Sequence, residues 1–192
     1  WQPLIDAAGA ILHIRRNAEQ FGTDPAKIAI CGFSAGGHLA ASTAILWDAE
    51  PVQTALGIHG TEARPDAVVL GYPVITAGEY RHDGSIVNLC GDDADLRATM
   101  SLENQVRDGL PPFFVWHTVE DPSVPVQNSL MLAGALTAHK VPLELHLFRP
   151  RRPRHKHLHA GRSTPPTSTT APGWPSARTG WPKPLIFTCN RR

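Results

Sequence analysis

The stretch from Lys27 to Trp47 constrains the fold most, because it joins a strand to a helix through a short glycine-rich turn. After Lys27, residues 28–31 are apolar and include the β-branched Ile28 and Ile30, which predicts a buried strand over 27–31. Residues 39–47 are rich in small apolar side chains and predict a helix. The residues between them, 31–38, read Cys-Gly-Phe-Ser-Ala-Gly-Gly-His. This arrangement is typical of α/β proteins.

The turn has the pattern Gly-x-Ser-x-Gly, with Ser34 at its centre. Between a strand and a helix this pattern is that of a nucleophile elbow, in which a sharp turn raises the serine above the sheet edge. Gly32 and Gly36 lack Cβ atoms, so we expect them to let the two backbones approach. The start of the helix leaves backbone N–H groups free, among them that of Ala35, which can face an oxyanion. The alternative is an ordinary glycine-rich turn with an incidental serine, but the flanking elements favour the nucleophile.

The remaining apolar patterns predict alternating helices and strands over residues 1–148. We expect strands at 27–31, 66–71, 112–117 and 142–148, and longer helices at 3–21, 39–47 and 124–139. Residues 48–65 are expected to form a loop, and residues 76–110 an irregular segment with short helices. This order predicts a mainly parallel sheet flanked by helices.

The composition changes sharply near residue 148. Residues 1–148 contain all 17 acidic residues and 8 basic ones, whereas residues 149–192 contain 10 basic residues, no acidic ones and 8 of the 18 prolines. We therefore expect a partial domain at 1–148 and an irregular, disordered basic tail at 149–192. A polycation can bind nucleic acid nonspecifically, but no recognition fold accompanies it, so no specific nucleic-acid partner is expected.

Targeting and redox features are few. No apolar run reaches 18 residues, so we expect no transmembrane helix and no membrane partner. The chain begins with Trp1, which suggests an incomplete N-terminus, and without a visible signal peptide a cytoplasmic location is expected. The three cysteines, Cys31, Cys90 and Cys189, do not form a disulfide framework. Cys31 is expected to be a small buried side chain.

Asp121 is the second candidate site residue, in the loop after the third predicted strand. The carboxyl ends of parallel strands share one edge of a sheet, so we expect Asp121 near Ser34. Its functional role would be to orient a catalytic histidine and stabilise the imidazolium. Two alternatives stay open: Asp121 caps the helix that begins near Val124, or the neighbouring Glu120 is the acid. The chain order, serine before aspartate, favours Asp121 as the acid.

A base is still needed, and in this chain order it should follow the last predicted strand. His155 lies nearest that place and is the candidate, provided that it reaches hydrogen-bond distance of the serine. His38 and His117 lie near the expected site, but structural hydrogen bonds are the favoured role for both. His155, His157 and His159 alternate along the tail, yet no acidic or cysteine cluster accompanies them, so a metal site there is not favoured. The serine mechanism needs no metal or organic cofactor, and none is expected.

Several segments together resemble the α/β-hydrolase esterases, and most of all their acetyl-esterase and acetylxylan-esterase-like branch. These are residues 32–40 (Gly-Phe-Ser-Ala-Gly-Gly-His-Leu-Ala), residues 70–75, residues 111–118, and the pattern Asp121-x-x-Val124-Pro125-x-x-Asn128-Ser129. The resemblance covers about residues 3–148 and implies a partial α/β-hydrolase fold. It also implies that Ser34 is the nucleophile, Asp121 the triad acid and the Ala35 N–H an oxyanion donor.

The activity implied by this resemblance is hydrolysis of short-chain carboxylic esters, acetyl esters above all, on small-molecule or carbohydrate substrates. An acyl-enzyme would form on the serine and then be hydrolysed. Two alternatives stay open: a serine peptidase on the same fold, and a catalytically inactive fragment or binding module. The sequence indicates neither the acyl and alcohol specificity nor the oligomeric state.

The chain departs from the family pattern at both ends. The early strands and the His-Gly-Gly-type loop of the family are absent, so we expect an exposed sheet edge and poor stability. Where the family has a histidine turn, residues 148–154 read Phe-Arg-Pro-Arg-Arg-Pro-Arg. Reading from the second base of the Phe148 codon permits Phe-Gly-x-Gly-Gly-His-Gly, so a frameshift is our hypothesis for the missing acids and the excess of proline. Translation of the source DNA in all frames tests it.

Overall fold

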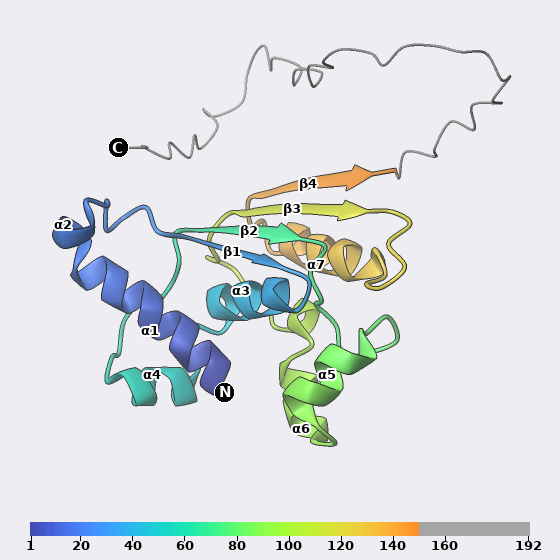
Figure 1. Cartoon of the computed structure of the whole chain (residues 1–192), viewed down its shortest axis with the longest axis horizontal. Coiled ribbons are helices and arrows are strands. Elements are labelled where there is room, and N and C mark those ends of the chain that lie inside the picture. The colour runs from blue at the N-terminus through green and yellow to red at the C-terminus, as the bar shows by residue number, and fades with distance from the viewer. Residues whose placement is uncertain (150–192) are drawn as a thin grey trace, which may run out of the picture. The chain divides into compact units, whose positions relative to one another are not determined.

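The computed structural model describes residues 1–149, and the predicted tail and its histidines lie outside these residues. Four parallel strands form one sheet in the order β1-β2-β3-β4, with helices between them (Figure 1). The predicted α/β architecture is therefore confirmed. In chain order the elements are α1 (Gln2–Arg16), α2 (Ala18–Phe21), β1 (Ala29–Phe33), α3 (Ala35–Ile45), α4 (Glu50–Leu56), β2 (Ala67–Gly71), α5 (Asp83–Cys90), α6 (Ala94–Thr99), the 3₁₀ turn η1 (Leu102–Asn104), β3 (Phe113–Thr118), α7 (Gln127–Ala138) and β4 (Leu143–Phe148).

The prediction of a loop over residues 48–65 is wrong, because α4 lies within it. Pro51 stands in the first turn of α4, where its missing N–H leaves no hydrogen bond unmade. Gly57, with φ of 62°, ends the helix in the left-handed conformation. The two residue types that suggested a loop thus start and stop a helix. The first predicted helix is also divided at Asn17, into α1 and α2.

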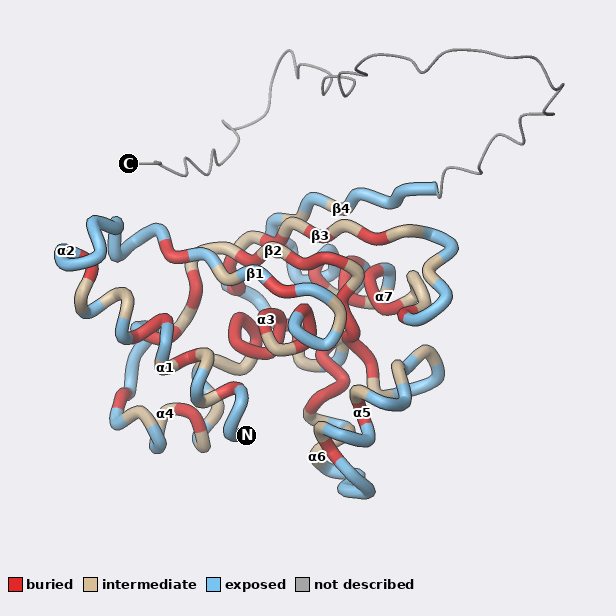
Figure 2. Tube along the Cα trace, in the orientation of Figure 1, coloured by how far each residue is buried: buried red, intermediate tan, exposed pale blue. Residues whose placement is uncertain are grey.

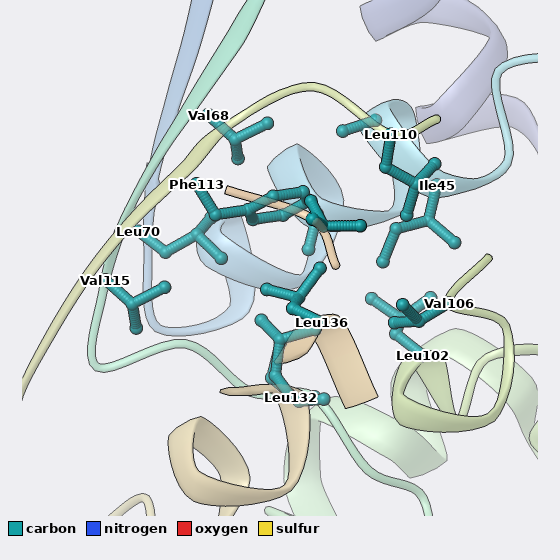
Figure 3. Close-up of a cluster of buried hydrophobic side chains, with 14 of the residues drawn as sticks. Ile45, Val68, Leu70, Leu102, Val106, Leu110, Phe113, Val115, Leu132 and Leu136 are labelled. Carbon is teal, nitrogen blue, oxygen red and sulfur yellow. The ribbon is translucent and has the colours of Figure 1, made fainter. Parts of the chain in front are cut away.

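The main core lies on the face of the sheet that α3 and α7 cover. Alternate strand residues point into it, because successive side chains of a strand face opposite ways. Figure 3 shows these side chains meeting those of the helices and of the segment that follows η1; the labelled residues are Ile45, Val68, Leu70, Leu102, Val106, Leu110, Phe113, Val115, Leu132 and Leu136. Each buried Val, Leu or Phe side chain contributes about 1.5–3 kcal/mol, so this cluster fixes α3 and α7 against the strands.

The opposite face of the sheet is covered by none of the described elements. An aromatic row crosses it near the carboxyl ends of the strands and consists of Phe33, Tyr72, Trp116 and Phe148, with neighbouring ring centroids 5.2 to 6.5 Å apart. Phe33 is 49% exposed and Phe148 45% exposed. Figure 2 shows the outer strands β1 and β4 exposed over much of their length, whereas β2 is largely buried. Within residues 1–149, β1 pairs with β2 alone and is therefore an edge strand of the sheet, as expected.

Cys31 corrects one expectation, because it is exposed rather than buried. In β1 the buried residue is its neighbour Gly32, and Cys31 points the other way, toward the uncovered face. Within residues 1–149 there is also no helix with the length and apolar character needed to cross a membrane.

Candidate active site

Ser34 is the one residue between β1 and α3, and its backbone is strained, with φ of 53° and ψ of −124°. Its N–H donates to the Gly71 carbonyl at 3.0 Å. Its own carbonyl accepts from the N–H groups of Gly37, His38 and Val74 at 3.0, 3.2 and 3.1 Å. The strained turn is thus held by α3 on one side and by the segment after β2 on the other. The residue remains partly exposed, as an attacking serine must be.

Close approach of β1 and α3 depends on glycines, though not on the pair that was expected. A Cβ on Gly32 would lie 2.1 Å from the carbonyl oxygen of Gly36 and 2.9 Å from the Cβ of Ala40. A Cβ on Gly37 would lie 2.8 Å from the Cβ of Pro73. A Cβ on Gly36 would meet nothing within 4 Å, so the expected role of Gly36 is wrong. The missing Cβ atoms therefore matter at Gly32 and Gly37. The sequence signal for Gly37 was the pair of adjacent glycines, Gly36 and Gly37.

The first turn of α3 directly follows Ser34. Among the described residues, the N–H groups of Ala35 and Gly36 have no backbone acceptor. Unpaired N–H groups at a helix start attract negative charge. The turn therefore leaves two N–H donors directly after Ser34 in the chain, and the oxyanion role expected for Ala35 stays a prediction.

Asp121 lies in the loop between β3 and α7, at the same end of the sheet as Ser34 (Figure 1). Its Oδ1 accepts from the N–H groups of Ser123 and Val124 at 2.8 and 2.9 Å. The carboxylate thus fixes a turn, but it does not cap α7, which starts further along the chain. Its Oδ2 lies 4.0 Å from Nε2 of the buried His117, and the side chain is 17% exposed. Glu120 is exposed. Asp121 therefore presents one oriented oxygen, as an acid that holds a histidine requires.

His38 and His117 are buried and have the structural roles that were favoured for them. Nε2 of His117 donates to the Val124 carbonyl at 3.0 Å, and its Nδ1 lies 2.7 Å from the Ser129 hydroxyl. Nε2 of His38 donates to the Met100 carbonyl at 2.9 Å. Burial lowers the pKa of both imidazoles, which keeps them neutral. With their nitrogens engaged, neither is placed as the base, and His155 lies outside the described residues.

Asn128 ties together the two loops that flank the site. Its Oδ1 accepts from the N–H groups of Ile75 and Thr76 at 2.8 and 3.1 Å. Its Nδ2 donates to the carbonyls of Tyr80 and Pro125 at 2.8 and 3.1 Å. The side chain is fully buried, and all its hydrogen-bonding capacity is used. It thereby holds the segment that anchors the serine turn against the loop of the aspartate.

No metal site is formed by the part of the chain that the structure describes. Within residues 1–149 there is no group of three or more His, Cys, Asp or Glu side chains that could hold an ion. The described residues of the candidate site are the Ser34 turn, two N–H groups without a backbone acceptor and the fixed Asp121 carboxylate.

Comparison with known proteins decides the family. Residues 2–136 match the family model described as BD-FAE, which is more than half of the chain. This chain belongs to the BD-FAE family. The expected resemblance to α/β-hydrolase esterases is confirmed, since solved structures of such esterases share the fold of the BD-FAE chain.

Three relatives extend well beyond the part of them that this chain matches. It is 42% identical over 149 residues to endo-1,4-beta-xylanase B of Butyrivibrio fibrisolvens, covering 77% of this chain and 23% of the relative. It is 32% identical over 130 residues to an acetylxylan esterase of Xylanibacter ruminicola, covering 65% and 25%. The acetyl ester-xyloside bifunctional hydrolase of Caldicellulosiruptor lactoaceticus superposes with a TM-score of 0.67 at 42% identity, covering 76% of this chain and 54% of that structure. The chain thus spans about a quarter of these curated relatives and about half of the solved structure.

Proposed function

We propose that the chain hydrolyses short-chain carboxylic esters, above all acetyl esters, through an acyl-enzyme on Ser34. The observation that supports this best is the strained Ser34 turn at the carboxyl end of β1, immediately before the free N–H groups of α3. Asp121 at the same end of the sheet supplies the second group that such a mechanism needs.

The proposed reaction uses these groups together with a histidine as the base. The Ser34 hydroxyl attacks the carbonyl carbon of the ester while a histidine takes its proton. The Ala35 N–H donates to the oxyanion of the tetrahedral intermediate. The carbon–oxygen bond to the alcohol then breaks, and the histidine returns the proton to the leaving oxygen. Water releases the acid from the serine by the same steps. Through its Oδ2, Asp121 orients the histidine and stabilises its cation.

The substrate class is proposed from the relatives. Two of them are named for acetyl esters: the Xylanibacter ruminicola acetylxylan esterase and the Caldicellulosiruptor lactoaceticus acetyl ester-xyloside hydrolase. We therefore propose acetyl groups on small molecules or carbohydrates as the substrates of this chain, with His155 as the base.

The first experiment labels the purified chain with a fluorophosphonate and measures turnover of p-nitrophenyl acetate. We expect one label per chain, located on Ser34 by peptide mass spectrometry, and its complete loss in Ser34→Ala. Ser42→Ala is the matched control, since Ser42 is buried in α3 and bonded to the His38 carbonyl at 2.8 Å. The Ser42→Ala chain should still be labelled on Ser34.

Two further variants test the partners of the serine. Asp121→Asn keeps the Oδ1 acceptor for the Ser123 and Val124 N–H groups but removes the charge. It should lower kcat by roughly 10³–10⁴-fold with little loss of stability. His155→Asn should lower kcat as far if His155 is the base.

Faster hydrolysis of a proline p-nitroanilide than of the acetate would indicate a peptidase instead. Absence of both labelling and turnover would indicate an inactive fragment and refute the proposal.

A further inference from the structure

We propose that His117 is a positioning residue, which holds the carboxylate of Asp121 in place through the backbone of Val124. This inference rests on the proposed function, in which Asp121 orients the histidine that acts as the base. It adds to the serine and the aspartate a third side chain, which touches neither the substrate nor the reacting atoms and acts on the reaction only through the position of Asp121.

The hydrogen bonds of the His117 ring fix its tautomer. Nε2 lies 3.0 Å from the Val124 carbonyl oxygen, which can only accept, so Nε2 carries the proton. Nδ1 is then unprotonated and accepts from the Ser129 hydroxyl at 2.7 Å. Burial lowers the pKa of this imidazole, so the ring stays neutral and Nδ1 stays an acceptor. His117, at the end of β3, therefore joins α7 to the loop that lies between them.

Val124 transmits this constraint to Asp121. Its carbonyl is held by the His117 ring, and its N–H donates to Oδ1 of Asp121 at 2.9 Å. The two groups flank the same Cα atom, so the position of the carbonyl limits the position of the N–H. His117 has no hydrogen bond of its own to Asp121, since Nε2 and Oδ2 are 4.0 Å apart. The connection from the ring to the carboxylate therefore runs through the backbone of Val124.

The loop that carries Asp121 needs such support. It spans residues 119–126 and contains Pro122 and Pro125, which have no N–H to hold it. The Asp121 side chain is partly exposed, whereas His117 is fully buried, so a fixed internal ring sets the position of a carboxylate near the surface. A carboxylate displaced by about 1 Å would misplace the histidine that it orients, and an error of that size can cost about 10²-fold in rate.

Asparagine and glutamine at position 117 separate the two hydrogen bonds of the ring. The side-chain oxygen of asparagine can take the place of Nδ1 and accept from Ser129, but asparagine is too short to reach the Val124 carbonyl. The side-chain nitrogen of glutamine can take the place of Nε2 and donate to that carbonyl, while the Ser129 hydroxyl loses its acceptor. Each variant replaces a buried ring and breaks one hydrogen bond, so His117→Gln is the matched control for His117→Asn.

The activity test measures kcat and KM for p-nitrophenyl acetate with the full chain and both variants, at a temperature where circular dichroism shows all three folded. His117→Asn should lower kcat by about 10²-fold at unchanged KM, because Asp121 moves while the groups that contact the substrate remain. His117→Gln should retain a kcat roughly tenfold or more above that of His117→Asn. Equal kcat values in the two variants, or a wild-type kcat in His117→Asn, would overturn the inference.

Two NMR measurements on the ¹⁵N-labelled chain separate this inference from the proposed function, because neither depends on turnover. The ring nitrogen shifts of His117 should place the proton on Nε2, and a proton on Nδ1 would overturn the inference. Hydrogen exchange of the Val124 amide should be roughly tenfold or more faster in His117→Asn than in His117→Gln, since the loop loses its anchor. This exchange pattern without turnover by the wild type refutes the esterase proposal alone. Acetate turnover with equal exchange in the two variants refutes the positioning role alone.

Discussion

Replacement of Gly32 by alanine tests whether the serine turn depends on contact between β1 and α3. The added Cβ would lie 2.1 Å from the carbonyl oxygen and 2.6 Å from the carbonyl carbon of Gly36, and 2.9 Å from the Cβ of Ala40. The first two atoms are backbone, so no rotamer change relieves the overlap. α3 must move away from β1 by on the order of 1 Å, within a core packed to crystal-like density. Overpacking of this kind costs about 3 kcal/mol.

The same motif supplies the control, because Gly36→Ala places a Cβ in open space within a helix. This variant should be neutral or more stable by up to about 1 kcal/mol. Urea unfolding, followed by far-ultraviolet circular dichroism, gives both free energies of unfolding. On heating, Gly32→Ala should melt roughly 6–12 °C below the wild type. Equal stability of the Gly32→Ala and Gly36→Ala chains would refute the packing argument.

Two further predictions concern buried polar side chains. Asn128→Ala breaks four hydrogen bonds and should lower the free energy of unfolding by about 3 kcal/mol, against about 0.5 kcal/mol for Leu130→Ala at an exposed position of the same helix. Equal losses in urea unfolding would contradict this. Burial lowers the pKa of His38 and His117, so the unfolded chain binds more protons below its imidazole pKa of about 6.5. Stability should be complete above that pH and fall as the pH drops through it, by up to about 1.4 kcal/mol per pH unit for each imidazole. Urea midpoints at pH 7.5 and 5.5 measure this, and unchanged midpoints would count against it.

The serine and aspartate positions could be predicted because each depends on local sequence and one topological rule. Ser34 is placed by a turn of a few residues, and Asp121 by the fact that parallel strands end at one edge. α4 could not be recognised as readily, since Pro51 and Gly57 have opposite meanings inside a loop and at the ends of a helix. A short sequence pattern therefore predicts the structure where only one conformation fits it, and it fails where a loop and a helix end both fit it.

Other features depend on contacts between distant segments. The burial of Cys31 was mispredicted because a continuous apolar run does not show which face of a strand is covered. The partners of Asn128 at Ile75 and Thr76 are more than fifty residues away in the chain, so its anchoring role has no local signal. The sequence also did not show that Gly37, rather than its neighbour Gly36, permits close packing. That depends on Pro73, which a Cβ on Gly37 would overlap and a Cβ on Gly36 would not.

The aromatic row of Phe33, Tyr72, Trp116 and Phe148 has a consequence for the yield of folded protein. Two copies that meet through such rings during refolding associate at a rate that rises with the square of concentration, whereas folding of one copy is independent of it. Slow dilution from denaturant to low protein concentration should therefore recover more monomer than rapid transfer at high concentration. Arginine, whose guanidinium stacks on aromatic rings, is a suitable additive for the refolding buffer.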